Sequence, residues 1–272
     1  KKKWNPKMLP YIFAEKKGIH IIDLNKTVEG LQEAAAAMKA IARSGKKIMF
    51  VATKKQAKEL VTECAQRVNM PYVTERWLGG MLTNFNTVRK SVKKMQSIEK
   101  LLNDGSAESL NKKEKLTLSR EKEKMEKVLG GIAQISRIPA ALFLIDIGHE
   151  HIALAEAKKL GINTFGMVDS NCDPNKVDFA IPSNDDATKS IAIITNYITA
   201  AIAEGLQERQ SSKDDEEQHE VEESAAARAS RFEQKDAEGD DKGKRSRSSG
   251  GTGGTKRRFP SAGGGGRKPA AK

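Results

Sequence analysis

The chain changes character at Glu75-Arg76-Trp77-Leu78-Gly79-Gly80-Met81-Leu82-Thr83-Asn84-Phe85. Before this stretch the residues alternate between strand-like and helix-like patterns. After it, a charged, helix-forming run continues until about Ala140. Glycine has no Cβ and adopts backbone conformations closed to other residues, so Gly79-Gly80 permits a sharp exit from a folded domain. A second pair, Gly130-Gly131, ends the charged run. The two pairs predict one insertion that leaves and re-enters the domain at a hinge.

Arg76 and Trp77 lie at the predicted base of this insertion. A cation beside a large flat ring is a pairing suited to RNA, because bases stack on aromatic rings and phosphates attract arginine. The alternative is that Trp77 packs in the core while Arg76 is solvated.

The charge of the chain is unevenly distributed. The 272 residues carry a formal net charge of +12 and are 38% hydrophobic, a low value for one compact globule. Residues 207–241 hold 5 basic and 13 acidic side chains, and residues 242–272 hold 10 basic and no acidic ones. Residues 1–206 therefore keep a net charge of +10. A basic body suits a polyanionic partner.

Cysteine usage and hydropathy narrow the class of protein. Cys64 and Cys172 are the only cysteines and belong to no Cys-x-x-Cys pair, which argues against a disulfide framework or a zinc cluster. No run of about 18 apolar residues is present, so we expect no membrane-spanning helix. No signal peptide is recognisable.

Residues 1–85 and 129–206 predict a discontinuous α/β domain. Apolar runs typical of strands alternate with helical stripes, which implies a parallel, doubly wound sheet of about five strands in flavodoxin-like order. The expected strands are 48–52, 71–73, 141–145, 164–168 and 179–181. A basic, extended opening over 1–8 and a short hairpin of 12–13 with 19–22 precede them, and Asn25 or Thr27 caps the first helix.

The insertion, residues 86–128, predicts an antiparallel helical hairpin with a coiled-coil seam. It holds 12 Lys or Arg against 7 Asp or Glu. The apolar seam positions are Val88, Val92, Met95 and Leu102 on one helix and Leu118, Met125 and Ile132 on the next. Glu121 and Lys122 interrupt the seam, so the pair should be marginally stable and need a partner, and it should not support the sheet.

Residues 207–272 predict a disordered tail, acidic first and then basic. They are rich in Ser, Glu, Asp, Gly and Lys and bury too little apolar surface to offset the entropy of ordering. We expect their removal to leave thermal stability unchanged.

Two enzyme-like interpretations compete with RNA binding. A doubly wound sheet can bind nucleotides at its switch point, but Thr53-Lys54-Lys55-Gln56 has no glycine for a pyrophosphate and no GxxxxGK[ST] motif occurs. A metal site is the second, since suitable residue types follow neighbouring strands: Asp146, His149, His151, Asp169, Cys172 and Asp173. Asn184-Asp185-Asp186 precedes a long helix and is interpreted as its cap.

Four motifs, in order along residues 3–205, closely resemble the bacterial-type small ribosomal subunit protein 2 family. They are Trp4-Asn5-Pro6-Lys7-Met8, Gly18-Ile19-His20-Ile21-Ile22-Asp23-Leu24, Arg76 to Phe85, and Asn171-Cys172-Asp173-Pro174 followed by 181–187. The sequence departs from the family by lacking a His-Phe-Gly-His-like segment, by having Ser183 in place of glycine, and by its tail.

The resemblance implies a flavodoxin-like domain with a protruding coiled-coil hairpin, bound to small-subunit rRNA on the solvent side near the head–body junction. It also implies docking of small ribosomal subunit protein 1 and no catalytic activity. We expect no cofactor, metal, membrane association or homo-oligomer, and we expect a cytoplasmic ribosome, with an organellar ribosome as the open alternative. A soluble nucleotide- or metal-binding enzyme and a free-standing RNA-binding regulator are the alternatives.

The expected RNA contacts combine the basic opening, the base of the hairpin and its two helices. Such contacts go to phosphates and position the protein without reading sequence. The predicted residues are Lys1, Lys2, Lys3, Trp4, Lys7, Arg76, Asn84, Arg89, Lys90, Lys93, Lys94, Lys112, Lys113 and Arg120.

Overall fold

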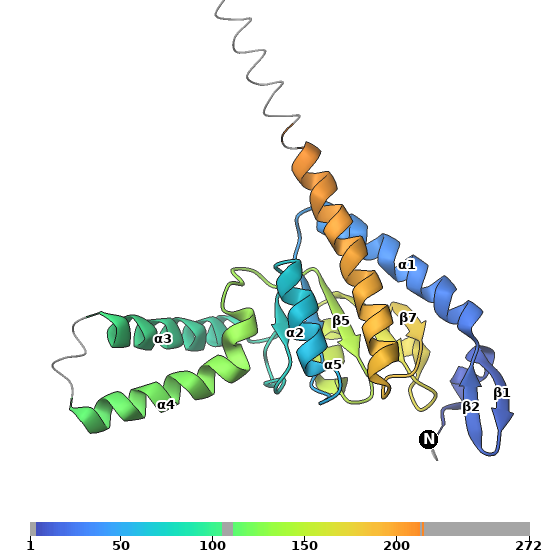
Figure 1. Cartoon of the computed structure of the whole chain (residues 1–272), viewed down its shortest axis with the longest axis horizontal. Helices are drawn as coiled ribbons and strands as arrows, with labels where there is room; N and C mark the ends of the chain where they lie inside the picture. Colours follow the sequence, from blue (N-terminus) through green and yellow to red (C-terminus); the bar gives the residue numbers. More distant parts are fainter. Residues whose placement is uncertain (1–3, 105–110, 213, 215–272) are drawn as a thin grey trace, which may run out of the picture. The chain divides into compact units, whose positions relative to one another are not determined.

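The sheet consists of five parallel strands in the order β4-β3-β5-β6-β7 (Figure 1). The computed structural model describes residues 4–104, 111–212 and 214. The strands are β3 (Ile48–Val51), β4 (Tyr72–Val73), β5 (Ala141–Ile145), β6 (Asn163–Val168) and β7 (Phe179–Pro182). Counted from β3, this is the order 2-1-3-4-5 of flavodoxin-like sheets, as the sequence predicts. The order reverses between β3 and β5, which pair directly.

Alternating side chains of the strands enter two separate cores. On one face Phe50, Phe143 and Phe165 are fully buried against α1 (Leu24–Arg43), α2 (Lys58–Arg67) and a C-terminal helix over 188–212. On the other face Met49 and Leu142 pack with α5 (His151–Lys159), residues of 77–82 and the base of the hairpin. Because both faces are covered, the strands have continuous apolar sequences without polar alternation.

The N-terminal segment is not the extended arm that we predicted. Pro6–Tyr11 form a 3-10 helix, η1, because the Asn5 side chain accepts a hydrogen bond from the Lys7 N–H and Met8 is fully buried. The Asn5 N–H also donates to the Ser170 carbonyl at 2.8 Å. β1 (Ile12–Lys16) and β2 (Ile19–Ile22) then form the expected hairpin.

Two predicted helix boundaries are wrong for local reasons. Asp23, and neither Asn25 nor Thr27, caps α1, because its carboxylate accepts from the Asn25 N–H at 2.9 Å. The C-terminal helix runs to residue 212, so residues 207–212 are helical and do not belong to a disordered tail. Glu208 forms an ion pair with Lys39 of α1 at 2.8 Å. The rest of the predicted tail lies outside the described residues, apart from Asp214.

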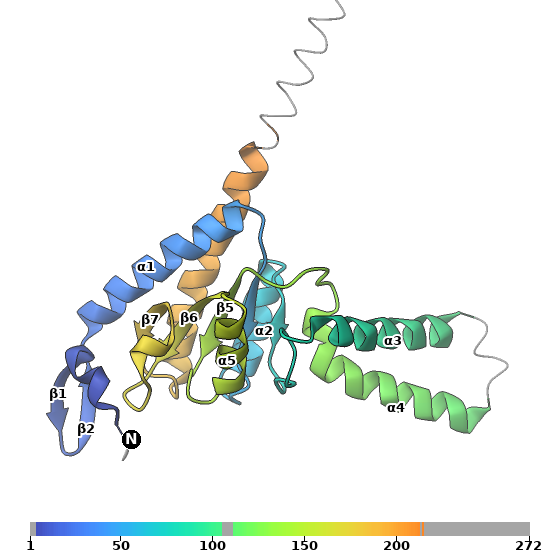
Figure 2. The same cartoon turned by 180° about the vertical axis from the view of Figure 1, so that it is seen from behind.

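The insertion is a pair of helices, α3 (Phe85–Asn103) and α4 (Lys112–Leu129), that lie side by side and lead away from the sheet in both views (Figures 1 and 2). Val92, Met95 and Ile98 are buried on α3. Glu121 and Lys122 do not interrupt the contact between the helices. They form ion pairs across it, with Lys94 at 2.5 Å and with Glu99 at 2.9 Å.

The base of this hairpin belongs to the core of the domain. Val92, Leu129 and Ile132 are buried in the same cluster as the sheet residues Met49 and Leu142. The hairpin and the sheet also fall in one compact unit that ends at Asp214. A boundary at residues 86 and 128 therefore cuts through packed side chains.

Glu156 of α5 fixes the segment that enters the hairpin. Its carboxylate is buried and accepts hydrogen bonds from the Gly80 N–H at 2.7 Å, the Leu82 N–H at 3.0 Å and the Trp77 indole at 3.1 Å. Thr83 adds its N–H at 3.0 Å and its hydroxyl at 3.1 Å. Five donors thus surround one carboxylate.

In each of the two glycine pairs, the local geometry requires glycine at one of the two positions. Gly80 has a φ of +86°, a conformation that residues with a Cβ rarely adopt. Gly131 lies in η3 (Gly130–Ile132), where a Cβ would collide with the carbonyl oxygen of Tyr72. One pair therefore permits the turn before α3, and the other permits close approach of the returning chain to β4.

We expect a chain that ends at residue 206 to melt at a lower temperature than one that ends at residue 212. The shorter chain loses the Lys39–Glu208 ion pair and Arg209, whose guanidinium lies against Gly45. Differential scanning calorimetry of both truncations measures the contribution of residues 207–212. Equal melting temperatures would contradict the structure.

Glu156→Gln should destabilise the protein at neutral pH by roughly 1–3 kcal/mol, since an amide presents N–H groups to donors that need an acceptor. Burial by itself raises the pKa of Glu156, but hydrogen bonds from Thr83, Trp77, Leu82 and Gly80 leave its pKa below the usual value of 4.5.

The sign of the pH effect follows from this lowered pKa. The carboxylate contributes stability above its unfolded pKa, and this contribution is lost as pH falls through the folded pKa. Denaturant melts from pH 6 to pH 3 should therefore show a smaller acid loss for Glu156→Gln than for the unaltered protein. Glu33→Gln, which removes an exposed acid from α1, is the control and should retain the full loss.

Candidate functional site

The outer face of α3 presents cations to solvent. Arg89, Lys90 and Lys93 are exposed, and no ion pair joins them to a carboxylate among the described residues. Lys94 differs, because its ammonium is held by Glu121 of α4. Lys100, which the sequence analysis missed, is also exposed. Lys100 follows Lys93 by seven residues, which places both side chains on one face of the helix. This spacing is the pattern that would have identified Lys100 from the sequence.

α4 presents a second row of exposed cations. Lys112, Lys113 and Arg120 are all exposed, as predicted from the sequence. Lys127 follows Arg120 by seven residues, although it also pairs with Glu123 at 3.1 Å. Lys112 and Lys113 occupy the first turn, where a cation opposes the helix dipole at a cost of about 0.3–1 kcal/mol. An anionic partner at this end would remove that cost.

The base of the hairpin contributes less than the sequence suggests. Arg76 is exposed. Asn84 is exposed too, but its Oδ1 accepts a hydrogen bond from the Thr87 hydroxyl at 2.8 Å. Trp77 is only 7% exposed, and its indole donates to Glu156. Trp77 is therefore a core residue, and its interpretation as an RNA-stacking platform is wrong.

The basic N-terminal segment is partly committed within the protein. Lys7 forms an ion pair with Asp173 at 2.6 Å, and this contact holds the pKa of the Asp173 carboxyl below its usual value. Trp4 is 40% exposed, and its ring centroid lies 5.0 Å from that of His20. Lys1, Lys2 and Lys3 lie outside the described residues.

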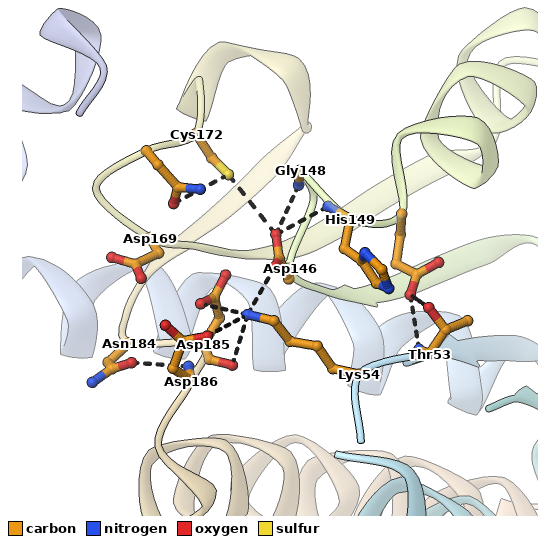
Figure 3. A network of polar contacts seen from close by, with 12 residues as sticks. Thr53, Lys54, Asp146, Gly148, His149, Asp169, Cys172, Asn184, Asp185 and Asp186 are labelled. Atoms are coloured by element: carbon orange, nitrogen blue, oxygen red, sulfur yellow. Dashed lines mark hydrogen bonds and ion pairs between the residues drawn. The ribbon is translucent and has the colours of Figure 1, made fainter. Parts of the chain in front are cut away.

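A lysine-centred cluster occupies the carboxyl ends of β3 and β5 (Figure 3). The Lys54 ammonium lies 2.8 Å from Asp146, 2.8 Å from Asp185 and 2.7 Å from Asp186. Asp185 is fully buried, and Asp146 has a φ of +67° that lets its carboxylate also accept the Gly148 and His149 N–H groups.

The electrostatics of this cluster favour its charged form. Burial by itself lowers the pKa of Lys54, but hydrogen bonds to Asp146, Asp185 and Asp186 offset this effect and leave its pKa above the ordinary value. Burial likewise raises the pKa of Asp146, and the contact with Lys54 more than reverses that, so its pKa is lowered. Glu150, four residues after Asp146, accepts hydrogen bonds from the Thr53 N–H at 2.8 Å and from the Thr53 hydroxyl at 2.5 Å.

This cluster fills the switch point, where flavodoxin-like sheets bind ligands. Three carboxylates hold the Lys54 ammonium, which is therefore not available to the phosphates of a nucleotide. The loop after β3 uses Thr53 and Lys54 for internal contacts. The geometry thus gives the nucleotide-enzyme alternative no support.

The six residues of the metal alternative do not come together as one ligand set. His149 and His151 are exposed, and Asp173 is paired with Lys7. A different group, Asp169, Asp185 and Asp186, has ligand atoms within 4.8 Å of one another. Two of its three carboxylates already hold the Lys54 ammonium.

The interpretation of 184–186 as a helix cap is only partly correct. Asn184 does accept hydrogen bonds from the Asp186 and Ala187 N–H groups at 2.9 and 3.4 Å. Asp185 instead points into the Lys54 cluster (Figure 3). No sequence pattern connects Asp185 with Lys54, which lies 131 residues earlier.

The comparisons with known proteins agree on one family. A family model described as "Ribosomal protein S2" matches residues 1–205. Small ribosomal subunit protein uS2 of Cytophaga hutchinsonii is 65% identical over 213 residues, which cover 78% of this chain and 84% of that protein. The uS2 proteins of Bacteroides thetaiotaomicron and Porphyromonas gingivalis are 61% and 57% identical over the same length, covering 77% and 76% of those proteins. The chain belongs to the ribosomal protein S2 family.

Proposed function

We propose that this protein is a structural constituent of the small ribosomal subunit, held there by contacts between its basic hairpin and small-subunit rRNA. The observation that carries the proposal is the set of exposed cations on the outer faces of α3 and α4. Membership of the ribosomal protein S2 family supports a structural role and not an enzymatic one.

Structured RNA is the polyanion that best suits this surface. Arg89, Lys93 and Lys100 share one face of α3, while Lys113, Arg120 and Lys127 recur every seven residues on α4. Seven residues correspond to a rise of about 10.5 Å, so the cations form rows along a rod. Rows of this kind follow a phosphate backbone and do not enter a groove to read base edges.

The remaining predicted contacts fall into two groups. Arg76 adds a cation at the base of the hairpin and Asn84 adds a polar side chain there, while Lys1, Lys2 and Lys3 would add an N-terminal contact. Lys7 and Lys94 already have carboxylate partners, so they contribute less than the sequence suggests.

A second surface supports docking of neighbouring ribosomal proteins, including small ribosomal subunit protein 1. Phe13, Ile19 and Leu24 are 76%, 65% and 75% exposed around the β1–β2 hairpin and the start of α1. Exposed apolar side chains are candidates for contacts with another protein. No helix in the described part of the chain is long and apolar enough to cross a membrane. We place the protein in the ribosome of the cytoplasm or of an organelle.

The affinity for structured RNA should depend steeply on salt. If about six phosphates are neutralised, the slope of log K against log salt for duplex-like RNA is roughly −4 to −5. Replacing Arg89, Lys93 and Lys100 with Gln should reduce that slope by about 2–3. Lys55, Lys159 and Lys189 are exposed elsewhere and serve as the matched control, whose replacement should leave the slope nearly unchanged. A slope near zero would refute the electrostatic account.

Shortening the hairpin should separate RNA binding from folding. Replacing residues 94–123 with a Gly-Ser turn removes Lys112, Lys113 and Arg120 but retains Val92 and Leu129, which pack in the core. We expect the domain to stay folded and rRNA affinity to fall more than tenfold, about 1.4 kcal/mol.

The measurements are a thermal melt and incorporation into reconstituted small subunits. Normal incorporation of the folded, shortened chain would overturn the role of the hairpin. Replacing the whole of 86–128 should lower the melting temperature further, because Val92 leaves the core. The same melt tests the sequence-based expectation that the insertion does not support the sheet.

A further inference from the structure

A basic groove lies at the amino ends of β3 and β5, opposite to the Lys54 cluster. Lys46 and Lys47 precede β3, and residues 133–140 return from the hairpin to β5 along its other side. The volume of the groove is about 1030 Å³. That volume is at the upper end of the roughly 300–1,000 Å³ typical of ligand pockets. We name it the basal groove, with Lys46, Lys47, Tyr72, Gln134, Arg137 and Ile138 among its lining residues.

The charge of the basal groove is entirely positive. Lys46, Lys47 and Arg137 line it, and the described residues place no Asp or Glu in the lining. All three are exposed, and none forms an ion pair among the described residues. The Lys47 ammonium is oriented by the Asn69 carbonyl oxygen at 2.6 Å and retains further N–H groups. Three cations without carboxylates predict an anionic occupant.

Besides its cations, the basal groove is lined by apolar side chains and side-chain amides. Ile138 is 44% exposed, and Ile135 and Tyr72 are half-buried beside it. Gln134 and Gln66 add side-chain amides. Cations, apolar surface and amides in one concave site suit unpaired nucleotides, whose phosphates, base faces and base edges require these three chemistries. Duplex RNA presents only phosphates and sugars to such a groove.

The basal groove is less suitable for a peptide, because the edge of β4 is not free at this position. Peptides bind commonly by adding a strand to an exposed sheet edge. β4 is the edge strand, but Gly131 covers it at the Tyr72 carbonyl, as the clash of a Cβ there demonstrates.

We infer that the basal groove binds a short unpaired stretch of RNA, with Lys46 and Arg137 on its phosphates and Ile138 against a base. The inference rests on the proposed function in that RNA is the partner. The inference goes beyond the proposed function because it names a second RNA site. This site binds single strands and is separate from the outer faces of α3 and α4.

The test measures binding of the full chain to a labelled short oligouridylate, an oligoadenylate and a duplex RNA. Lys46→Gln with Arg137→Gln should weaken single-strand binding by roughly tenfold and reduce the magnitude of its salt slope by about 1.4, or 0.7 per phosphate. Ile138→Ser should weaken single-strand binding at an unchanged salt slope. Duplex binding should change little with either variant.

Two controls distinguish the outcomes. Lys159→Gln with Lys189→Gln removes the same charge elsewhere, and the Arg89, Lys93 and Lys100 replacements should weaken duplex binding more than single-strand binding. If groove and control variants weaken both RNAs equally, the groove contributes only general charge and the inference fails. If the groove variants bind every RNA as the unaltered chain does, the groove is not an RNA site and the inference fails. If no RNA binds the unaltered chain, the proposed function itself fails.

Discussion

The buried carboxylate of Glu156 determines where the hairpin leaves the domain. A single acceptor receives three backbone N–H groups, an indole and a hydroxyl from residues 77–83. An ionised carboxylate can satisfy this many donors, whereas a neutral side chain cannot. The same contacts draw Trp77 into the core and so decide its role. These contacts and the burial of Val92 attach the start of α3 to the sheet.

The two ends of the parallel sheet differ in how their cations are used. At the carboxyl ends, Lys54 is enclosed by Asp146, Asp185 and Asp186, so the position that binds ligands in this fold is occupied by internal ion pairs. At the amino ends, Lys46 and Arg137 face solvent, and no carboxylate lies beside them within the described part of the chain. The fold therefore does not indicate the function, because the available cations lie away from the usual ligand crevice.

The sequence predicted those features that depend on local patterns. Continuous apolar runs located all five strands, and the α/β alternation gave their order. The exposed cations of α3 and α4 were also predictable, since a helical period separates them from the seam. The sequence alone could not predict pairing between distant residues. The examples are Glu156 with 77–83, Lys54 with Asp185, and Lys7 with Asp173. Each depends on tertiary distance, and a lone Lys or Asp has the same local signature whether it is paired or solvated. The length of the last helix was missed because polar residues 207–212 are ordered by Lys39 and Gly45 of another element.

The stability of the hairpin and the RNA binding that we propose for it are coupled. Beyond Val92 the two helices share few buried side chains, and the Lys94–Glu121 and Lys122–Glu99 ion pairs between them are partly accessible to solvent, so each adds little stability. A ligand that binds only the ordered hairpin stabilises it by mass action. Salt weakens the internal ion pairs and would weaken the proposed phosphate contacts as well. Bound RNA would neutralise the repulsion among cations on one face, and it would offset the unfavourable position of Lys112 and Lys113 in the first turn of α4. On the proposed function, RNA bound to the hairpin therefore also stabilises the pairing of α3 with α4.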